Sequence, residues 1–363
     1  VLKLEDKSVI EIADEPRGQL QDYTWSPDSA WIAYSMTGAE GIRSIYIYDV
    51  AQNQTHRIDS GIFDETNPVW DPDGDYLYFL SVRDYAPQLS NIEWNYAGAR
   101  NDGIFAYALR KDVKNPFPPQ DDTITIDTHS ASDVKTTAGD VAKTADTKPE
   151  EKKPGTKAVQ IDFDGLASRV IRVPVSPDNY RSLHALKGHL LYVRTGNQYY
   201  GRDSDWQAAL VIYSIKDRKE TVLADNIRGY AVSADGKKLL VREGSAFSIM
   251  DASPGGRAGK KNVSTAGLMY NRVPSQEWTQ IFNEVWRRYR DFFYVKNMHG
   301  YDWEKLRVQY APLLEYVGHR SDLNYVIGEM IAELNIGHAY ITGGDWAIPP
   351  RPRVALPGAR FEL

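Results

Sequence analysis

The feature that most constrains this chain is a unit that recurs in its first two thirds: a short strand-like run, a turn rich in Pro, Asp and Gly, and a second strand-like run. The unit occupies residues 23–35, 68–80 and 230–241. Asp and Gly favour tight turns, because both tolerate positive φ and Asp also bonds to its own backbone. The turn residues Asp28 and Asp73 are about 45 residues apart, which is the length of one four-stranded propeller blade.

Further strand-like runs extend this pattern to about four blades. They occupy residues 44–48, 104–108 and 247–250, and a fourth unit combines residues 189–193 with 210–214. Because a single blade cannot bury both of its faces, blades pack against one another around a common axis. The opening run, residues 8–12, is typical of the outer strand of a blade whose beginning is missing. We therefore expect part of a propeller that has more than four blades.

Two changes in composition predict the domain organisation. Residues 115–157 are rich in Pro, Thr, Asp, Lys and Ala and poor in large apolar side chains, so we expect a mobile insertion within a propeller of residues 1–265. A Gly-rich break at 251–261 is followed by apolar residues spaced three and four apart, which predicts a helical domain over residues 266–345. The predicted fold class is multidomain and mainly β: a partial β-propeller of four-stranded antiparallel blades, followed by a small α-helical domain.

The last predicted helix, residues 321–334, leads to a histidine at a defined place. Ser321 is a good N-cap, and apolar residues then recur along one helix face. We expect Gly337 to end this helix in the left-handed conformation and a strand to begin after His338. An imidazole held between two elements is suited to act as a general base. By spacing alone, a purely structural histidine is an open alternative.

Composition excludes several classes of function. The 363 residues include no Cys, which removes disulfides, thiol nucleophiles and thiolate metal sites. The formal net charge of −6 favours no nucleic-acid partner, and no apolar run approaches the roughly 18 residues of a membrane span, so we expect no membrane partner. The chain has neither a Gly-rich phosphate loop nor a Gly-x-Ser-x-Gly turn, and we expect no cofactor.

Two His–Asp pairs are candidate metal ligands. His299 and Asp302 are three residues apart, as are His319 and Asp322. Both pairs stand at predicted helix starts, where Asp is a capping residue, and neither matches a zinc signature of two histidines with a glutamate between them. We therefore expect no metal site.

The helical part resembles the first core domain of the tricorn-type serine peptidases, which belong with the carboxyl-terminal processing proteases. The motifs that carry this resemblance follow one another at residues 284–294, 299–303, 310–314, 320–323 and 329–340. A propeller precedes these motifs here, as in that family. The resemblance implies two tandem propellers, then a helical core domain, a PDZ-like domain and an α/β core domain. This chain would hold the later part of the second propeller and the first core domain, and residues 346–363 would lead into the PDZ-like domain.

The resemblance also implies a function. In this family the histidine after the last helix activates a serine of the second core domain, so His338 takes the role of general base. The best-known member has a serine immediately before this histidine, where this chain has Gly337, and that orienting role is not transferred. The family cleaves oligopeptides, assembles as hexamers and is cytoplasmic, with an exported form left open here. This chain alone would be inactive, because it has a base without a nucleophile.

Two other functions remain open from the residues. A propeller with a helical domain could be a non-catalytic scaffold that binds peptides or proteins. A propeller glycosidase would need carboxylates that converge in a central pocket. Asp71, Asp73 and Asp235 are better explained as turn residues.

Overall fold

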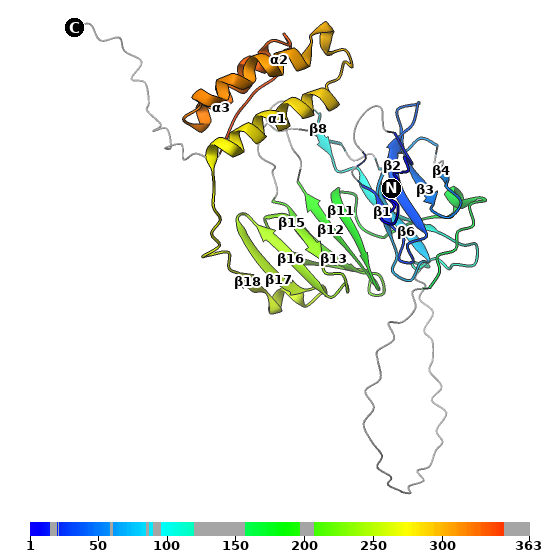
Figure 1. Cartoon of the computed structure of the whole chain (residues 1–363). Coiled ribbons are helices and arrows are strands. Elements are labelled where there is room, and N and C mark those ends of the chain that lie inside the picture. Colours follow the sequence, from blue (N-terminus) through cyan, green and yellow to red (C-terminus); the bar gives the residue numbers. More distant parts are fainter. Residues whose placement is uncertain are drawn as a thin grey trace, which may run out of the picture. The chain divides into compact units, whose positions relative to one another are not determined.

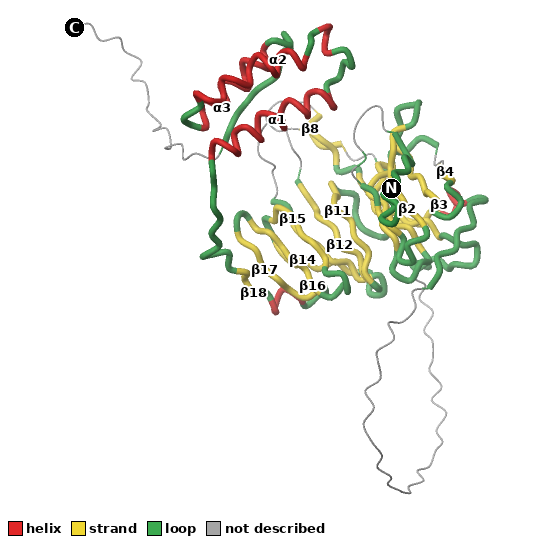
Figure 2. The backbone as a smooth tube through the Cα atoms, in the orientation of Figure 1, coloured by secondary structure: helices red, strands yellow, loops and turns green. Residues whose placement is uncertain are grey.

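The structure is a computed structural model, and it describes residues 1–14, 20, 22–58, 61–84, 87–89, 96–119, 157–196 and 207–344. The chain forms two compact units, residues 1–264 and residues 265–363. Strands dominate the first unit and helices the second (Figures 1 and 2). None of the helices in the described part of the chain is long and apolar enough to cross a membrane.

Four antiparallel sheets of four strands each build the first unit, and we refer to them as blades 1 to 4. Blade 1 contains β1 (Thr24–Trp25), β2 (Trp31–Thr37), β3 (Arg43–Asp49) and β4 (Gln54–Ile58). Blade 2 contains β5 (Glu65–Trp70), β6 (Tyr76–Val82), β9 (Asp102–Ala108) and β10 (Val170–Arg172). Blade 3 contains β11 (Asn179–Leu186), β12 (His189–Thr195), β13 (Ala209–Ser214) and β14 (Lys219–Ala224). Blade 4 contains β15 (Ile227–Val232), β16 (Lys238–Glu243), β17 (Ala246–Asp251) and β18 (Lys261–Val263).

The predicted fold class is confirmed by these sheets together with the helical second unit. A two-stranded ribbon of β7 (Pro87–Leu89) and β8 (Tyr96–Ala99) lies between β6 and β9 in sequence. The predicted insertion falls between β9 and β10 of blade 2, and its residues 120–156 lie outside the described part of the chain. The lead into a further domain, residues 346–363, also lies outside it.

The recurring turns owe their shape to one hydrogen-bond pattern. In blade 1 the Ser26 hydroxyl donates to Asp28 Oδ1 (2.6 Å) and accepts from the Trp31 N–H (2.9 Å). In blade 4 Ser233 donates to Asp235 Oδ1 (2.6 Å) and accepts from the Lys238 N–H (2.9 Å). Side-chain oxygens thus satisfy the backbone groups that the turn leaves open, which explains the spacing of Ser and Asp in the sequence.

Apolar side chains fill the space between successive blades. The core between blades 1 and 2 includes Ile45, Ile47, Leu77 and Phe79, all fully buried. Strand β3 is buried at six consecutive positions, Ser44–Asp49, because both of its faces are covered. Comparable clusters join blade 2 to blade 3 and blade 3 to blade 4. Stacking of two-faced sheets therefore holds the first unit together.

The opening run, residues 8–12, does not form the outer blade strand that its pattern predicts. Only an isolated bridge pairs Leu2 with Val9. The segment folds back on itself, since the Lys3 N–H donates to the Ser8 carbonyl (2.9 Å) and the Ile10 N–H to the Val1 carbonyl (2.7 Å). Val1, Ile12 and Ala13 pack on blade 1, whereas Leu2, Leu4 and Val9 are exposed. Packing on a sheet face has taken the place of pairing at a sheet edge.

Three α-helices form the described part of the second unit: α1 (Pro274–Phe292), α2 (Trp303–Tyr310) and α3 (Arg320–Ala332). The described residues also include four short 3₁₀ helices, η1 (Leu166–Arg169), η2 (Gly256–Gly259), η3 (Met298–Gly300) and η4 (Ala311–Tyr316). Phe282 of α1 and Leu323 and Met330 of α3 are fully buried in one core. Trp286 and Trp303 clamp α1 to α2, because each indole N–H donates to the other residue's carbonyl at 2.9 Å.

Candidate functional site

Helix α3 positions the chain that carries His338. The helix begins at Arg320, and the N-cap is His319, not the predicted Ser321. The Asp322 carboxylate accepts from the His319 N–H (2.8 Å) while the His319 ring accepts from the Ser321 N–H (3.2 Å). This reciprocal pair is a capping box, and it satisfies two backbone donors that an N-terminus leaves open. The buried face agrees with the predicted stripe at Leu323, Val326, Ile327, Met330 and Ile331.

The end of α3 differs from the prediction. The helix stops at Ala332, and Asn335 (φ 50°) and His338 (φ 59°) take the left-handed conformation, whereas Gly337 does not. Leu334 is fully buried and anchors the chain beyond the last turn, and Asn accepts positive φ more readily than most residues. The glycine is therefore not the stop signal.

The strand predicted after His338 is absent from the described residues 339–344, which have no regular secondary structure. A strand needs a neighbour for its backbone hydrogen bonds, and within residues 265–344 the structure has helices and turns only. The prediction of a helix–strand junction was wrong for the described part of this unit.

The His338 ring lies at the surface of the second unit. The residue is exposed, and its Nδ1 is 3.5 Å from the hydroxyl of Tyr340, which is itself 75% exposed. The two rings meet edge to face, with centroids 6.3 Å apart and planes at 75°. An imidazole that is open to solvent on its other side can accept a proton from a group that approaches it.

The other histidines of this unit have structural roles. His319 is the cap of α3, and its Nδ1 lies 2.8 Å from the Ser321 hydroxyl. The nearby Asp322 binds the His319 backbone, not its ring, so these three residues do not form a catalytic triad. His299 lies in the turn between α1 and α2 with its Nε2 2.8 Å from the Tyr294 hydroxyl. Among the described residues no group of three or more His, Asp and Glu side chains is arranged to hold a metal ion.

A second candidate site, which the sequence prediction missed, is a cavity of about 680 Å³ in the first unit. The first strands of the four blades, β1, β5, β11 and β15, end around it, and we call it the blade-end cavity. Two Trp–x–Pro pairs, Trp25 with Pro27 and Trp70 with Pro72, contribute to its wall, together with turn residues of blades 3 and 4. The equal offset of Trp and Pro from the turn aspartates in the first two units is the sequence signal that could have revealed it.

Charged and titratable groups also line the blade-end cavity. Lys187 is paired with Asp73 (3.1 Å), and His184 also contributes to the wall. The turn residue Asp71 lies beside the lining Trp70 and Pro72 and occupies the place that Ser26 and Ser233 hold in other blades. Burial, with the neighbouring carboxylates of Asp73 and Asp75, raises the pKa of Asp71 to about 6. A cavity with aromatic, proline and ionisable side chains suits a peptide better than a purely apolar ligand.

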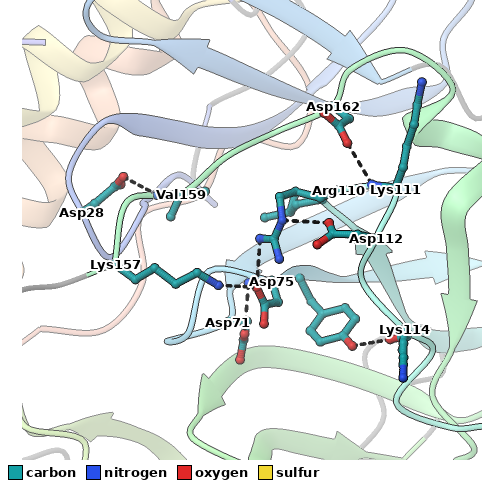
Figure 3. A network of polar contacts seen from close by, with 12 residues as sticks. Asp28, Asp71, Asp75, Arg110, Lys111, Asp112, Lys114, Lys157, Val159 and Asp162 are labelled. Atoms are coloured by element: carbon teal, nitrogen blue, oxygen red, sulfur yellow. Dashed lines mark hydrogen bonds and ion pairs between the residues drawn. The ribbon is translucent and has the colours of Figure 1, made fainter.

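A polar network ties the turns of blades 1 and 2 to the chain that returns to β10 (Figure 3). The Val159 N–H donates to Asp28 Oδ2 (2.7 Å), and Lys157 pairs with Asp75 Oδ1 (2.9 Å). Arg110 also donates to Asp75 Oδ1, at 3.0 Å. Burial acts to raise the pKa of Asp75, but the bonds from Lys157 and Arg110 outweigh it and lower that pKa. The Asp28 and Asp75 carboxylates are thus engaged in holding the turns of blades 1 and 2.

Comparisons with known proteins agree with this architecture. The family model described as "Tricorn protease second beta propeller domain" matches residues 1–253, and that described as "Tricorn protease C1 domain" matches residues 274–332. "Tricorn protease homolog 1" of Streptomyces coelicolor is 25% identical over 94% of this chain, which spans 32% of the relative. "Tricorn protease" of Thermoplasma volcanium is 22% identical over 100% of this chain and 33% of the relative.

Among solved structures, "Crystal structure of the tricorn protease" superposes with a TM-score of 0.72 at 21% identity. It covers 94% of this chain and 32% of the solved chain. The present sequence thus spans about a third of the length of the relatives it matches. With one family model covering well over half of the residues, and a second covering the helices, this chain belongs to the tricorn protease family.

Proposed function

We propose that this chain is part of a serine peptidase that degrades oligopeptides into shorter peptides, with His338 as the general base. Family membership supports a peptidase, and the observation that supports the base is the exposed imidazole just after the segment that matches the C1 domain model. A ring sealed in the core could not meet a partner hydroxyl. The nucleophile would be a serine of another domain of the longer protein, and this chain alone would be inactive.

The chemistry asked of His338 is proton transfer. A serine hydroxyl is a weak nucleophile until an adjacent base accepts its proton during attack on the peptide carbonyl. The same imidazolium then returns that proton to the departing amine, so that no net proton is consumed by the base. The exposed side of the His338 ring leaves room for both steps. Donors for the developing oxyanion would come from the domain that carries the serine.

Hydrolysis of a fluorogenic peptide by the full-length protein tests this role. We expect His338→Ala to lower kcat at least about 1,000-fold, as loss of a triad base does. His319→Asn is the matched control, because Asn is a good N-cap and this histidine is structural, and it should retain activity. Turnover by the full-length protein that survives His338→Ala would refute the assignment.

A second function, a non-catalytic scaffold that binds peptides or proteins, is favoured by the blade-end cavity and its Trp–x–Pro pairs. This function predicts that the full-length protein binds peptides without cleaving them. Calorimetric titration of peptides into wild type and Trp25→Ala measures such binding, since Trp25 is 46% exposed and its loss leaves the buried core intact. Peptide binding that is lost in Trp25→Ala, with no turnover by the wild type, would support the scaffold.

Assembly and compartment follow from the same proposal. We expect a homo-oligomer, a hexamer by family resemblance, located in the cytoplasm, with oligopeptides as its substrates. Native mass spectrometry of the full-length protein gives the subunit number directly. A monomer at micromolar concentration would contradict the expected assembly.

A further inference from the structure

The contact between His338 and Tyr340 has no role in capping or core packing. Both residues are exposed, so their rings bury little apolar surface on one another. The left-handed backbone at His338 (φ 59°) turns the chain there, and the rings of residues 338 and 340 meet edge to face at 6.3 Å. A non-glycine residue in that conformation is uncommon and carries strain, which makes this local arrangement a specific one.

A histidine that acts as a base needs its second ring nitrogen held. If Nδ1 carries the proton and donates it to an oxygen, Nε2 keeps a free lone pair for the serine hydroxyl. In catalytic triads a carboxylate is that oxygen. Gly337 has no side chain to offer, and the oxygen that the described structure places against Nδ1 is the Tyr340 hydroxyl, at 3.5 Å.

We propose that Tyr340 is a positioning residue for His338: its phenol oxygen accepts a hydrogen bond from Nδ1–H and so selects the tautomer with Nε2 free. This inference rests on the proposed function of His338. A contact of 3.5 Å is long for such a bond. Hydrogen bonds of catalytic groups are often long before substrate binds and shorten in the complex.

Tyr340→Phe in the full-length protein removes the hydroxyl and keeps the ring. We expect kcat for peptide hydrolysis to fall about 3- to 10-fold, as for the loss of one neutral hydrogen bond, with KM changed less than about twofold. Tyr325→Phe is the matched control, because Tyr325 is 69% exposed on α3 and has no place in the proposed site. It should leave both constants unchanged.

A spectroscopic measurement separates positioning from a structural effect. The ¹⁵N chemical shifts of the His338 ring, recorded where the ring is neutral, report which nitrogen carries the proton. We expect the Nδ1–H tautomer to dominate in the wild type and the Nε2–H tautomer to increase in Tyr340→Phe. Unchanged melting temperatures would confirm that neither variant perturbs the fold.

The outcomes are distinct for the two proposals. A Tyr340→Phe enzyme with wild-type kcat, or with an unchanged tautomer, overturns the positioning role while His338→Ala can still be inactive. A His338→Ala enzyme that stays active overturns the proposed function itself, whatever Tyr340→Phe does.

Discussion

The outward faces of blade 1 and blade 4 differ, although the two sheets share their topology. On blade 1, Ile32, Tyr34, Tyr46 and Tyr48 are at most 9% exposed, because the N-terminal segment packs over them. On blade 4, the apolar residues Leu240, Ile249 and Val263 are 41%, 41% and 38% exposed. The opposite face of blade 4 is closed, with Leu239, Val241 and Met250 buried against blade 3. One sheet is thus covered on both faces and the other on one face.

This difference shows what determines whether the face of a blade is buried. Strand β17 alternates between exposed and buried positions, as expected of a sheet with one covered face, whereas β3 is buried throughout. The two strands, β3 and β17, have similar apolar content. The neighbour on each face therefore decides the stability that a given side chain contributes, and matched substitutions in the two blades measure it.

The largest effect is expected from the same substitution on the two faces. Ile32→Ala removes a side chain that is 3% exposed and should lower the free energy of unfolding of the first unit by about 2–5 kcal/mol. Ile249→Ala, at 41% exposure, should cost less than about 1 kcal/mol. Urea denaturation of the whole chain, monitored by hydrogen exchange of the strand amides, measures both losses of stability. Equal losses would show that another segment covers blade 4 in solution.

A smaller effect is expected at the enclosed turn of blade 2. The pKa of Asp71 in the folded state is about 6, which is above its ordinary value. The contribution of Asp71 to stability is therefore fully present only below about pH 4. That contribution is lost as pH rises through 6. Asp71→Ser, which copies the turns of blades 1 and 4, should raise stability by about 1–3 kcal/mol at pH 7.5 and little at pH 4.

Melting curves of wild type and Asp71→Ser across this pH range provide the measurement. Asp73→Ser removes one of the neighbouring carboxylates that raise the pKa of Asp71 but leaves Asp71 in place, so it should give a smaller pH-dependent change than Asp71→Ser. If Asp71→Ser raises stability equally at every pH, then turn geometry, and not the buried charge, causes the gain.

The smallest effect is expected at the turn aspartates of blades 1 and 4. Burial acts to raise the pKa of Asp28, but hydrogen bonds from Ser26, Val159 and Ala30 outweigh it and lower that pKa. Such a carboxylate stabilises the fold above its ordinary pKa, and the stabilisation is lost as pH falls through its lowered value. Asp28→Asn should cost about 1 kcal/mol at neutral pH, because one oxygen that accepts from Val159 is lost.

Asp235 offers the comparison, since it makes the same turn and, within the part of the chain that the structure describes, accepts hydrogen bonds only from Ser233 and Lys237. Asp235→Asn should shift the melting temperature less than Asp28→Asn does. A larger shift for Asp235 would mean that the bond to Val159 adds nothing to the turn of blade 1.

Local patterns predicted much of this protein. The spacing of Trp, Pro and Asp gave the turns, the turns gave four blades, and the three-and-four spacing of apolar residues gave the helices. Those patterns work because each is satisfied by neighbours in sequence: Ser26 and Asp28 close their own turn, and Leu323 and Ile327 share one helix face. The family resemblance then favoured a catalytic role for His338, which periodicity by itself did not distinguish from a structural histidine.

Where the sequence prediction failed, a contact between distant segments decided the outcome. Residues 8–12 are apolar enough for a strand, but the segment folds back on residues 1–3, and of these five residues only Ile12 packs on the face of blade 1. The residues after His338 have the pattern of a strand, but the described residues of this unit contain no strand with which they could pair.

The blade-end cavity combines side chains from all four blades, which no local window contains. Sequence by itself determined the repeating elements and their turns, because hydrogen bonds within a turn and side-chain periodicity are local. Only the tertiary structure decided which faces are covered and which side chains meet, because burial depends on partners far away along the chain.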